Sequence, residues 1–278
     1  MTLFTPVVPT PSSFSIDHTT PMLLVGSCFT DSIGAKLQAA GFEVLCNPFG
    51  TLYNPLSIAL CMRHALADTP IDDRMLVQHE GVWHSWLHHS RFSNPDKDLC
   101  LKSCNEAIHT THQFLQLHPV LLFTFGTSYA FFRDGQVVAN CHKLPPQTFL
   151  RRRLAVQEIV EEWQSLMTQI DSPHLIFTVS PIRHLADTAH GNQLSKSTLL
   201  LALDQLGADY FPSYEILLDE LRDYRFYARD LCHPSDVAVD IVWERFQQTY
   251  MSPATRNQCL LNEKQFKHTQ HKPIVISE

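Results

Sequence analysis

The chain has 278 residues, of which 44% are hydrophobic and 18% charged. This apolar fraction, in a chain this long, can bury a core without disulfides, and it excludes a disordered tail, a collagen-like fibre and a coiled coil. The 21 Lys and Arg residues against 28 Asp and Glu give a net charge of −7, which argues against a protein that wraps nucleic acid or an anionic membrane.

The first 21 residues lack the basic and apolar segments of a secretory signal, and their prolines (Pro6, Pro9, Pro11) predict an extended lead-in strap. No window approaches the ~18 uncharged apolar residues of a membrane span. Eight cysteines are spread along the chain without a CxxC pair, which is typical of free thiols in a reducing compartment. We therefore expect a cytoplasmic protein.

The first half of the chain alternates strand and helix patterns. A short apolar run predicts a buried strand over 21–26, and Thr30 or Asp31 can cap a helix that ends near Ala40. A strand is expected over 42–46, a helix over 55–68, and a hairpin over 75–92 that turns at Glu80-Gly81. A helix over 96–117 and a strand over 120–125 follow.

The second half continues this alternation. Asp134-Gly135 predicts the turn of a hairpin over 131–138. Helices are expected over 148–170 and 194–206, and strands over 174–179 and 208–211. Ser235 can cap a last helix that ends near Tyr250, and the polar tail from Met251 is expected to be irregular. The triple-arginine run 151–153 is expected on a solvated face of the helix over 148–170.

Strands separated by helices predict a three-layer α/β/α sandwich with a mainly parallel sheet. Without a linker or an internal repeat, the whole chain (1–278) is expected to form a single domain, with its core over about 20–250 and the two hairpins as insertions. Ligands bind such sheets at the carboxyl ends of the strands. Residues 26–27, 47–50, 126–128 and 180–181 follow predicted strands and should share that rim.

Two segments carry residues suited to nucleophilic catalysis. Ser27 directly follows a buried strand and precedes a helix, whose N-terminus favours developing negative charge. Asp230 stands three residues before His233, so its carboxylate can bond one imidazole nitrogen and leave the other to act as a base. Either segment alone is also compatible with a simple turn or capping loop.

Together these segments have the chain order of the SGNH (GDSL-type) esterases, and the stretch 26–30 (Gly-Ser-Cys-Phe-Thr) resembles the motif that names the GSCFA family, a branch assigned to that superfamily. Further stretches that resemble the family are 47–51, 84–86, 125–128, 140–143, 180–184, 190–196 and 230–234. The resemblance covers about residues 20–250, and it implies an SGNH/flavodoxin-like sandwich.

The resemblance also implies a serine esterase. Ser27 would be the nucleophile, His233 the base and Asp230 the residue that orients His233, with the N–H of Gly50 in the oxyanion hole. Two departures stand out: the superfamily usually has Asp before the nucleophile, where this chain has Gly26, and Asn in its third block, where this chain has Ser128. The other candidate donors or substrate contacts are Gly126, Thr127, Asn140, His142 and His84.

Other residues leave alternatives open. Cys28 at a helix N-terminus is a competing nucleophile, or a small packed residue. The cluster His79, His84, His88 and His89 allows a metal-dependent hydrolase, but lacks H-E-x-x-H spacing, so no metal and no cofactor is expected. Arg183 and Lys196 can bind an anionic group of a substrate or lie at the surface.

The leading hypothesis is therefore an esterase acting on a small-molecule ester, with an acylated sugar suggested by superfamily analogy alone. An acyltransferase, or a binding module that has lost an efficient oxyanion hole, remain alternatives. Nucleic acid is not an expected partner.

Overall fold

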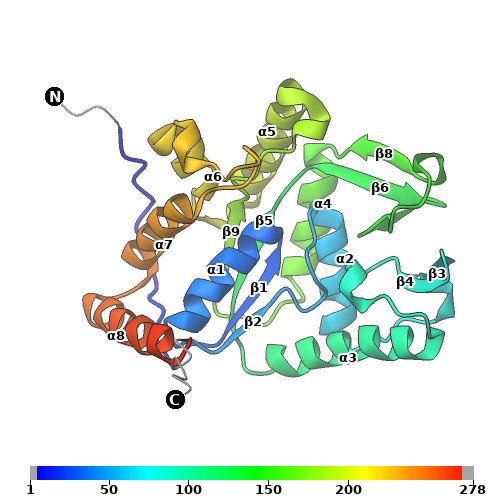
Figure 1. Cartoon of the computed structure of the whole chain (residues 1–278), viewed down its shortest axis with the longest axis horizontal. Coiled ribbons are helices and arrows are strands. Elements are labelled where there is room, and N and C mark those ends of the chain that lie inside the picture. Colours follow the sequence, from blue (N-terminus) through cyan, green and yellow to red (C-terminus); the bar gives the residue numbers. More distant parts are fainter. Residues whose placement is uncertain (1–4, 271–278) are drawn as a thin grey trace, which may run out of the picture.

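Five parallel strands form the central sheet, in the order β10-β9-β5-β1-β2 (Figure 1). They are β1 (Met22–Gly26), β2 (Val44–Cys46), β5 (Val120–Phe125), β9 (Leu175–Val179) and β10 (Asp209–Tyr210). The computed structural model describes residues 5–270. The chain leaves β1 toward β2 on one side and returns to β5 on the other, so a crevice is expected at the carboxyl ends of β1 and β5.

Helices cover both faces of this sheet, which confirms the α/β sandwich. One face carries α2 (Pro55–Leu66), α3 (Lys97–Leu115), α4 (Val156–Met167) and α5 (Thr188–Leu206). The other carries α1 (Cys28–Ala39), the short α6 (Ser213–Glu215) with the π-helical turn η5 (Ile216–Leu221), α7 (Asp236–Tyr250) and α8 (Pro253–Gln270). Strand side chains alternate between the two layers: Leu23 and Val25 join the first core, Met22 and Leu24 the second.

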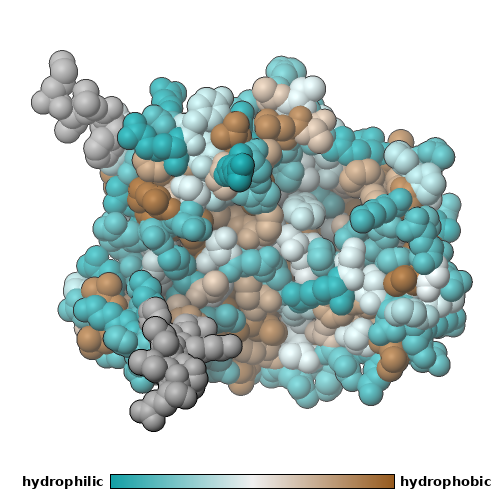
Figure 2. Space-filling view, in the orientation of Figure 1, coloured by the Kyte–Doolittle hydropathy of each residue, from teal (hydrophilic) through white to brown (hydrophobic). Residues whose placement is uncertain are grey.

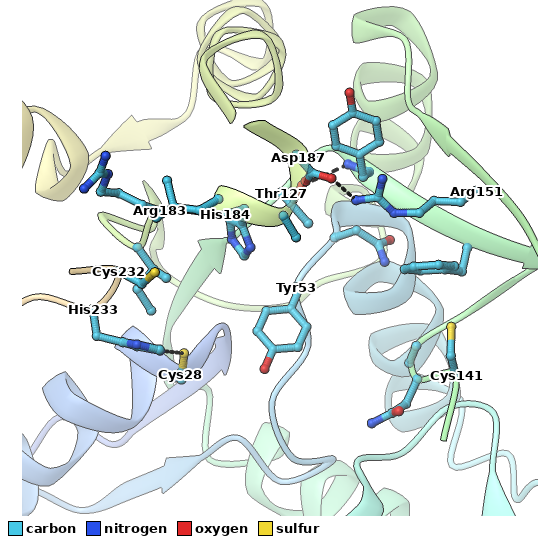
Figure 3. A pocket seen from close by; sticks show the side chains of 18 of the residues that line it. Cys28, Tyr53, Thr127, Cys141, Arg151, Arg183, His184, Asp187, Cys232 and His233 are labelled. Atoms are coloured by element: carbon cyan, nitrogen blue, oxygen red, sulfur yellow. Dashed lines mark hydrogen bonds and ion pairs between the residues drawn. The ribbon is translucent and has the colours of Figure 1, made fainter. Parts of the chain in front are cut away.

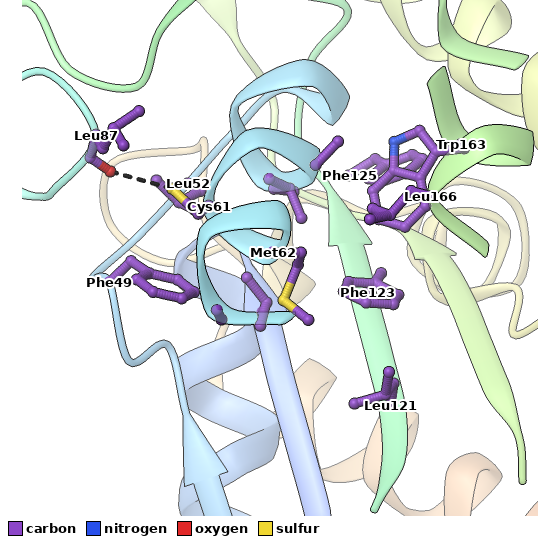
Figure 4. Close-up of a cluster of buried hydrophobic side chains, with 14 of the residues drawn as sticks. Phe49, Leu52, Cys61, Met62, Leu87, Leu121, Phe123, Phe125, Trp163 and Leu166 are labelled. Carbon is purple, nitrogen blue, oxygen red and sulfur yellow. Dashed lines mark hydrogen bonds between the residues drawn. The ribbon is translucent and has the colours of Figure 1, made fainter. Parts of the chain in front are cut away.

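Aromatic packing fixes α4 behind the centre of the sheet. The buried Trp163 ring lies 4.8 Å from Phe123, 5.0 Å from Phe125 and 5.1 Å from Phe177, measured between ring centroids (Figure 4). Its indole N–H donates to the carbonyl of Pro55, 3.2 Å away, which ties the start of α2 to the same cluster. The strand ends that form the rim therefore rest on a rigid layer.

Two small antiparallel sheets are inserted at one side of the molecule (Figure 1). The first pairs β3 (Leu76–His79) with β4 (Val82–Ser85), and the second has the order β7-β6-β8, from β6 (Tyr129–Arg133), β7 (Gln136–Val138) and β8 (Leu150–Arg153). Both expected hairpin turns are confirmed. Short 3₁₀ turns lie in the connections: η1 (Asp73–Met75), η2 (Ser90–Phe92), η3 (Pro146–Thr148), η4 (Leu185–Asp187) and η6 (Tyr224–Phe226).

The basic run 151–153 lies on strand β8 and not on a helix, so that expectation was wrong. The guanidinium of Arg151 stacks on the ring of Tyr129 at 4.3 Å, and Arg152 pairs with Glu158 through two hydrogen bonds. Glu158 also accepts the N–H of Ala155, 2.7 Å away, where α4 begins. These contacts between chain segments override the helical pattern.

The C-terminal tail was also predicted wrongly, because residues 253–270 form α8 and not an irregular segment. Its few apolar contacts include the fully buried Cys259. Polar residues supply the rest: Asn262 donates to the carbonyl of Ala40, and Trp243 of α7 donates to Glu263. Within residues 5–270, none of the helices is both long enough and apolar enough to cross a membrane.

Candidate active site

A cavity of about 580 Å³ opens at the carboxyl ends of the central strands. Its walls come from the start of α1, the loops that follow β2, β5 and β9, the inserted β6–β8 sheet, and the loop before α7. In the view of Figure 2 the middle of the face is hollowed and pale to brown, with hydrophilic residues around it. The cavity thus lies at the crevice that the strand order creates.

Three residues from two distant parts of the chain form a hydrogen-bonded series in this cavity. The Sγ atom of Cys28 lies 3.4 Å from Nε2 of His233 (Figure 3). Nδ1 of His233 lies 2.6 Å from Oδ2 of Asp230. An ionised carboxylate can only accept, so Nδ1 of His233 carries its proton and the lone pair of Nε2 faces the thiol. Nucleophilic catalysis requires this arrangement, in which a base contacts the nucleophile and a third residue orients the base.

The loop that carries Asp230 and His233 is held by its own hydrogen bonds. Oδ1 of Asp230 accepts the backbone N–H groups of Cys232 and His233 at 2.9 and 3.0 Å. These two bonds and the His233 side chain lower the pKa of Asp230 to about 2. Ser235 then caps α7 by accepting the N–H of Ala238. The imidazole is therefore oriented although it lies at the surface.

Cys28 is the first residue of α1 and half-buried. Burial raises the pKa of its thiol, while the backbone N–H groups of Cys28 and Phe29 act in the opposite direction. The net shift is upward, so the resting group is a neutral thiol next to the imidazole. Ionisation then requires proton transfer to His233.

Ser27, the expected nucleophile, is not brought to His233. It is the N-cap residue of α1, is 1% exposed, and its Oγ has no hydrogen-bond partner among residues 5–270. Its side chain packs toward Gly126, where an added Cβ would lie 3.4 Å from Cβ of Ser27. Because α1 begins at the next residue, Cys28 is the side chain that faces the cavity. The sequence signal for this side chain is its place at the N-terminus of a helix, which made Cys28 the competing candidate.

The expected backbone donors of the oxyanion hole are already engaged. The N–H of Gly50 donates to the carbonyl of Asn47 at 2.8 Å, and those of Gly126 and Thr127 donate to Tyr53 at 2.8 and 2.9 Å. Ser128 is fully buried, and both its N–H and its hydroxyl donate to Oγ of Ser195. Of these four residues, Thr127 lines the cavity, so the other three have structural roles in this geometry.

The end of the β6–β7 hairpin reaches the cavity, but the histidines beside it do not. Asn140 lines the cavity, and its Oδ1 accepts the backbone N–H of His142. His142 is 5% exposed, donates from Nε2 to the carbonyl of Ser85 at 2.7 Å, and stacks on His84 at 4.5 Å. His84 is hydrogen-bonded to Ser93. Neither His142 nor His84 is among the residues that line the cavity, so their role in substrate binding stays a prediction. Residues 5–270 contain no group of three or more metal-ligating side chains placed to hold an ion.

Some polar residues of the cavity were not predicted from the sequence, and one predicted residue lies elsewhere in the structure. Arg151 pairs with Asp187 across the wall opposite Cys28 (Figure 3). Tyr53 lies between Cys28 and the pair of Arg151 and Asp187 in the same view. Lys196, a candidate for anion binding, is fully buried and donates to the carbonyls of Gly126 and Ser180, and burial lowers its pKa to about 7. Lys196 thus cannot contact a substrate, whereas Arg183 lines the cavity.

The comparison with known proteins yields one family. The model of the GSCFA family matches residues 21–246, from β1 to α7, and so includes Cys28, Asp230 and His233. No curated protein matches the chain.

Proposed function

The chain belongs to the GSCFA family, and on this premise we propose that it hydrolyses acyl esters with the thiol of Cys28, and not the hydroxyl of Ser27, as nucleophile. The observation that carries the proposal is the series from Cys28 through His233 to Asp230, with contacts of 3.4 and 2.6 Å. Residues 205 positions apart in the chain meet there, at the rim where parallel sheets bind ligands.

The reaction proceeds in two steps. Sγ of Cys28 attacks the ester carbonyl carbon and its proton passes to Nε2 of His233. His233 then protonates the leaving alcohol oxygen as the C–O bond breaks, which leaves an acyl thioester on Cys28. Water attacks this thioester, giving its proton to His233, which returns it to the departing sulfur and releases the carboxylic acid. Asp230 stabilises the imidazolium in both steps.

The oxyanion is stabilised by donors other than those expected from the superfamily. The N–H of Cys28, at the first position of α1, has no carbonyl four residues before it to bond within the helix. The hydroxyl of Tyr53 lines the same cavity, and burial raises its pKa, so it remains a donor at neutral pH. Removal of one such donor costs about 10²–10³-fold in rate.

The side chains that line the cavity also determine which kind of acyl group fits. The lining of the cavity includes the apolar side chains of Phe131, Ala139 and Leu185. This composition suits an uncharged acyl chain. We therefore propose that the substrate is a small ester, and by superfamily analogy that its alcohol part is a sugar. All eight cysteines are free, which fits action in a reducing compartment such as the cytoplasm.

Labelling with iodoacetamide and hydrolysis of 4-nitrophenyl acetate test the proposal. We expect Cys28→Ala to lose activity by about 10⁴-fold or more, because the acyl thioester can no longer form. Cys232→Ser is the matched control: this cysteine lines the same cavity but has no contact with Nε2 of His233 among the hydrogen bonds of residues 5–270. Retention of activity by Cys28→Ala would refute the thiol mechanism. A folded wild type that hydrolyses no ester or thioester would favour the binding module.

A further inference from the structure

We propose that the alcohol part of the substrate carries an anionic group, a phosphate or carboxylate, and that Arg183 binds it in a subsite beside the catalytic cavity. This inference rests on the proposed ester hydrolysis and names the class of ester. The subsite is a second cavity of about 220 Å³, whose lining includes Arg183, Arg222, Tyr224, Tyr227 and one carboxylate, that of Asp223. Asp223 pairs with Arg225 and not with Arg183. Arg183 lines both cavities and lies between them.

The charge of Arg183 is not neutralised within the protein. The other two arginines of these cavities have carboxylate partners, since Arg151 pairs with Asp187 and Arg222 with Asp219. No carboxylate among residues 5–270 forms a salt bridge with Arg183. A cation without a counter-ion, in a chain with a net charge of −7, is a specific attraction for an anion.

Hydrogen bonds leave one edge of the Arg183 guanidinium available. Nη1 donates to the carbonyl of Leu231 at 3.0 Å, and the guanidinium carbon lies 5.3 and 5.8 Å from the ring centroids of Tyr227 and Tyr224. Nε and Nη2 have no acceptor among residues 5–270. These two groups form the edge that binds two oxygens of a phosphate or carboxylate at once. The tyrosine rings and the bond to Leu231 hold this edge in place.

The chemistry of the leaving group places the alcohol on this side of the cavity. His233 must protonate the leaving oxygen, so the alcohol lies on the His233 side of Cys28. Figure 3 shows Arg183, Cys232 and His233 on that side, with Arg151 and Cys141 on the opposite side. In this arrangement the alcohol extends past Cys232 toward Arg183, and the acyl group occupies the remaining part of the cavity.

Arg183 also supports the catalytic loop, and the experiment must separate this role from anion binding. Its backbone N–H donates to the carbonyl of Cys232 at 3.0 Å, and its side chain bonds Leu231. Loss of loop support lowers activity toward every ester, whereas loss of the anion contact lowers activity toward charged esters only. The ratio of kcat/KM for a charged and an uncharged ester therefore isolates the subsite.

The test compares 6-O-acetylglucose with 6-O-acetylglucose 1-phosphate. We expect wild type to prefer the phosphorylated ester by about 10- to 100-fold, mainly through KM, and Arg183→Met to remove most of this preference. Arg183→Lys keeps the charge without the two-pronged edge, so it should restore part of it. The control Arg74→Met removes the same charge at an exposed site far along the chain and should leave the ratio unchanged. Equal losses toward both esters in Arg183→Met would overturn the subsite.

Binding of glucose 1-phosphate, measured by calorimetry against glucose, keeps this inference separate from the hydrolysis. If no ester is hydrolysed but glucose 1-phosphate binds wild type and not Arg183→Met, the subsite stands and the hydrolase proposal fails. If the esters are hydrolysed and the phosphate adds nothing to binding or to kcat/KM, the hydrolase proposal stands and the subsite fails.

Discussion

His233 differs from the pair His88 and His142 in whether a ring nitrogen remains available to a ligand. His233 is about half exposed, and its Nε2 contacts a thiol that opens into the cavity. His88 and His142, beside the β3–β4 hairpin, are almost fully buried. His142 uses Nε2 for the carbonyl of Ser85, and His88 uses Nδ1 for the hydroxyl of the same residue.

The burial of His88 and His142 also changes how these two residues titrate. Burial lowers the pKa of His88 to about 3 and that of His142 to about 4, so both stay neutral through the physiological range. Nε2 of His88 has no hydrogen-bond partner among residues 5–270, but it is buried, so neither histidine has an open path by which to exchange protons with a substrate. A polar residue is therefore a catalytic candidate when one of its atoms has a partner that can react and an open path to it, and not merely because it lies near a strand end.

The sharpest test of the His233 group is Asp230→Asn. We expect ester hydrolysis to fall by about 10⁴-fold, because an amide N–H can force the wrong imidazole tautomer while the geometry survives. Thermal stability should change little, since the Asp230 side chain is half exposed. Because the pKa of Asp230 is lowered to about 2, its carboxylate stays ionised at all working pH values and adds no acidic limb to the rate profile.

Asp72→Asn is the matched control for Asp230→Asn. Asp72 is a similarly exposed carboxylate that also accepts a backbone N–H two residues on, from Arg74, but it lies outside the cavity. Its substitution should leave the rate unchanged. Equal rates for Asp230→Asn and wild type would show that His233 does not depend on its carboxylate.

The buried group is tested by the pH dependence of stability. The pKa of His142 is about 4 in the folded state against about 6.5 in the unfolded chain, so below pH 6.5 the unfolded state binds the additional proton. Its stabilising contribution is complete above pH 6.5 and is lost as the pH falls toward 4. In His142→Gln, an amide N–H can replace Nε2 but does not titrate, so unfolding curves between pH 7 and 4.5 should show a shallower loss.

The flattening in His142→Gln is only partial, because His88 and His184 titrate in the same direction. Activity per folded molecule should stay near that of wild type, since His142 does not line the cavity. A loss of activity with an unchanged pH slope would instead place His142 in the catalytic group.

Local patterns predicted most of the sheet. Strand β5 was expected over the residues it occupies, and the turns at Asp134-Gly135 and Glu80-Gly81 were found because each has a glycine, which adopts positive φ readily, at its second position. Strand β8 was missed, because its arginines are stabilised by rings of β6 and by Glu158 rather than by a pattern of their own. Helix α8 was missed for a similar reason, since Asn262 and Glu263 attach it to α1 and α7 through polar contacts.

The sequence predicted the order of the site's segments along the chain, but not which side chains and backbone groups face the cavity. Asp230 and His233 are close in sequence, so their contact follows from local geometry. The choice between Ser27 and Cys28 depends on the residue at which α1 begins, and a shift of one position reverses which side chain faces the cavity. The hydrogen bond from the N–H of Gly50 to the carbonyl of Asn47 could not be predicted from the sequence, because it depends on the folded loop.

The smallest effect is expected at the residue that the sequence favoured most, Ser27. Ser27→Ala should keep kcat/KM within about twofold and the free energy of unfolding within about 0.5 kcal/mol, because its buried hydroxyl has no hydrogen-bond partner to lose among residues 5–270. Replacing a serine N-cap usually costs about 1 kcal/mol, but that loss comes from a side-chain bond that Ser27 does not make. Ser235→Ala at α7, where this bond is present, should show the usual loss in the same denaturant titration. A fall of more than 100-fold in Ser27→Ala, with Cys28→Ala still active, would return the nucleophile to the hydroxyl and remove the distinction between buried groups and groups that are open to the cavity.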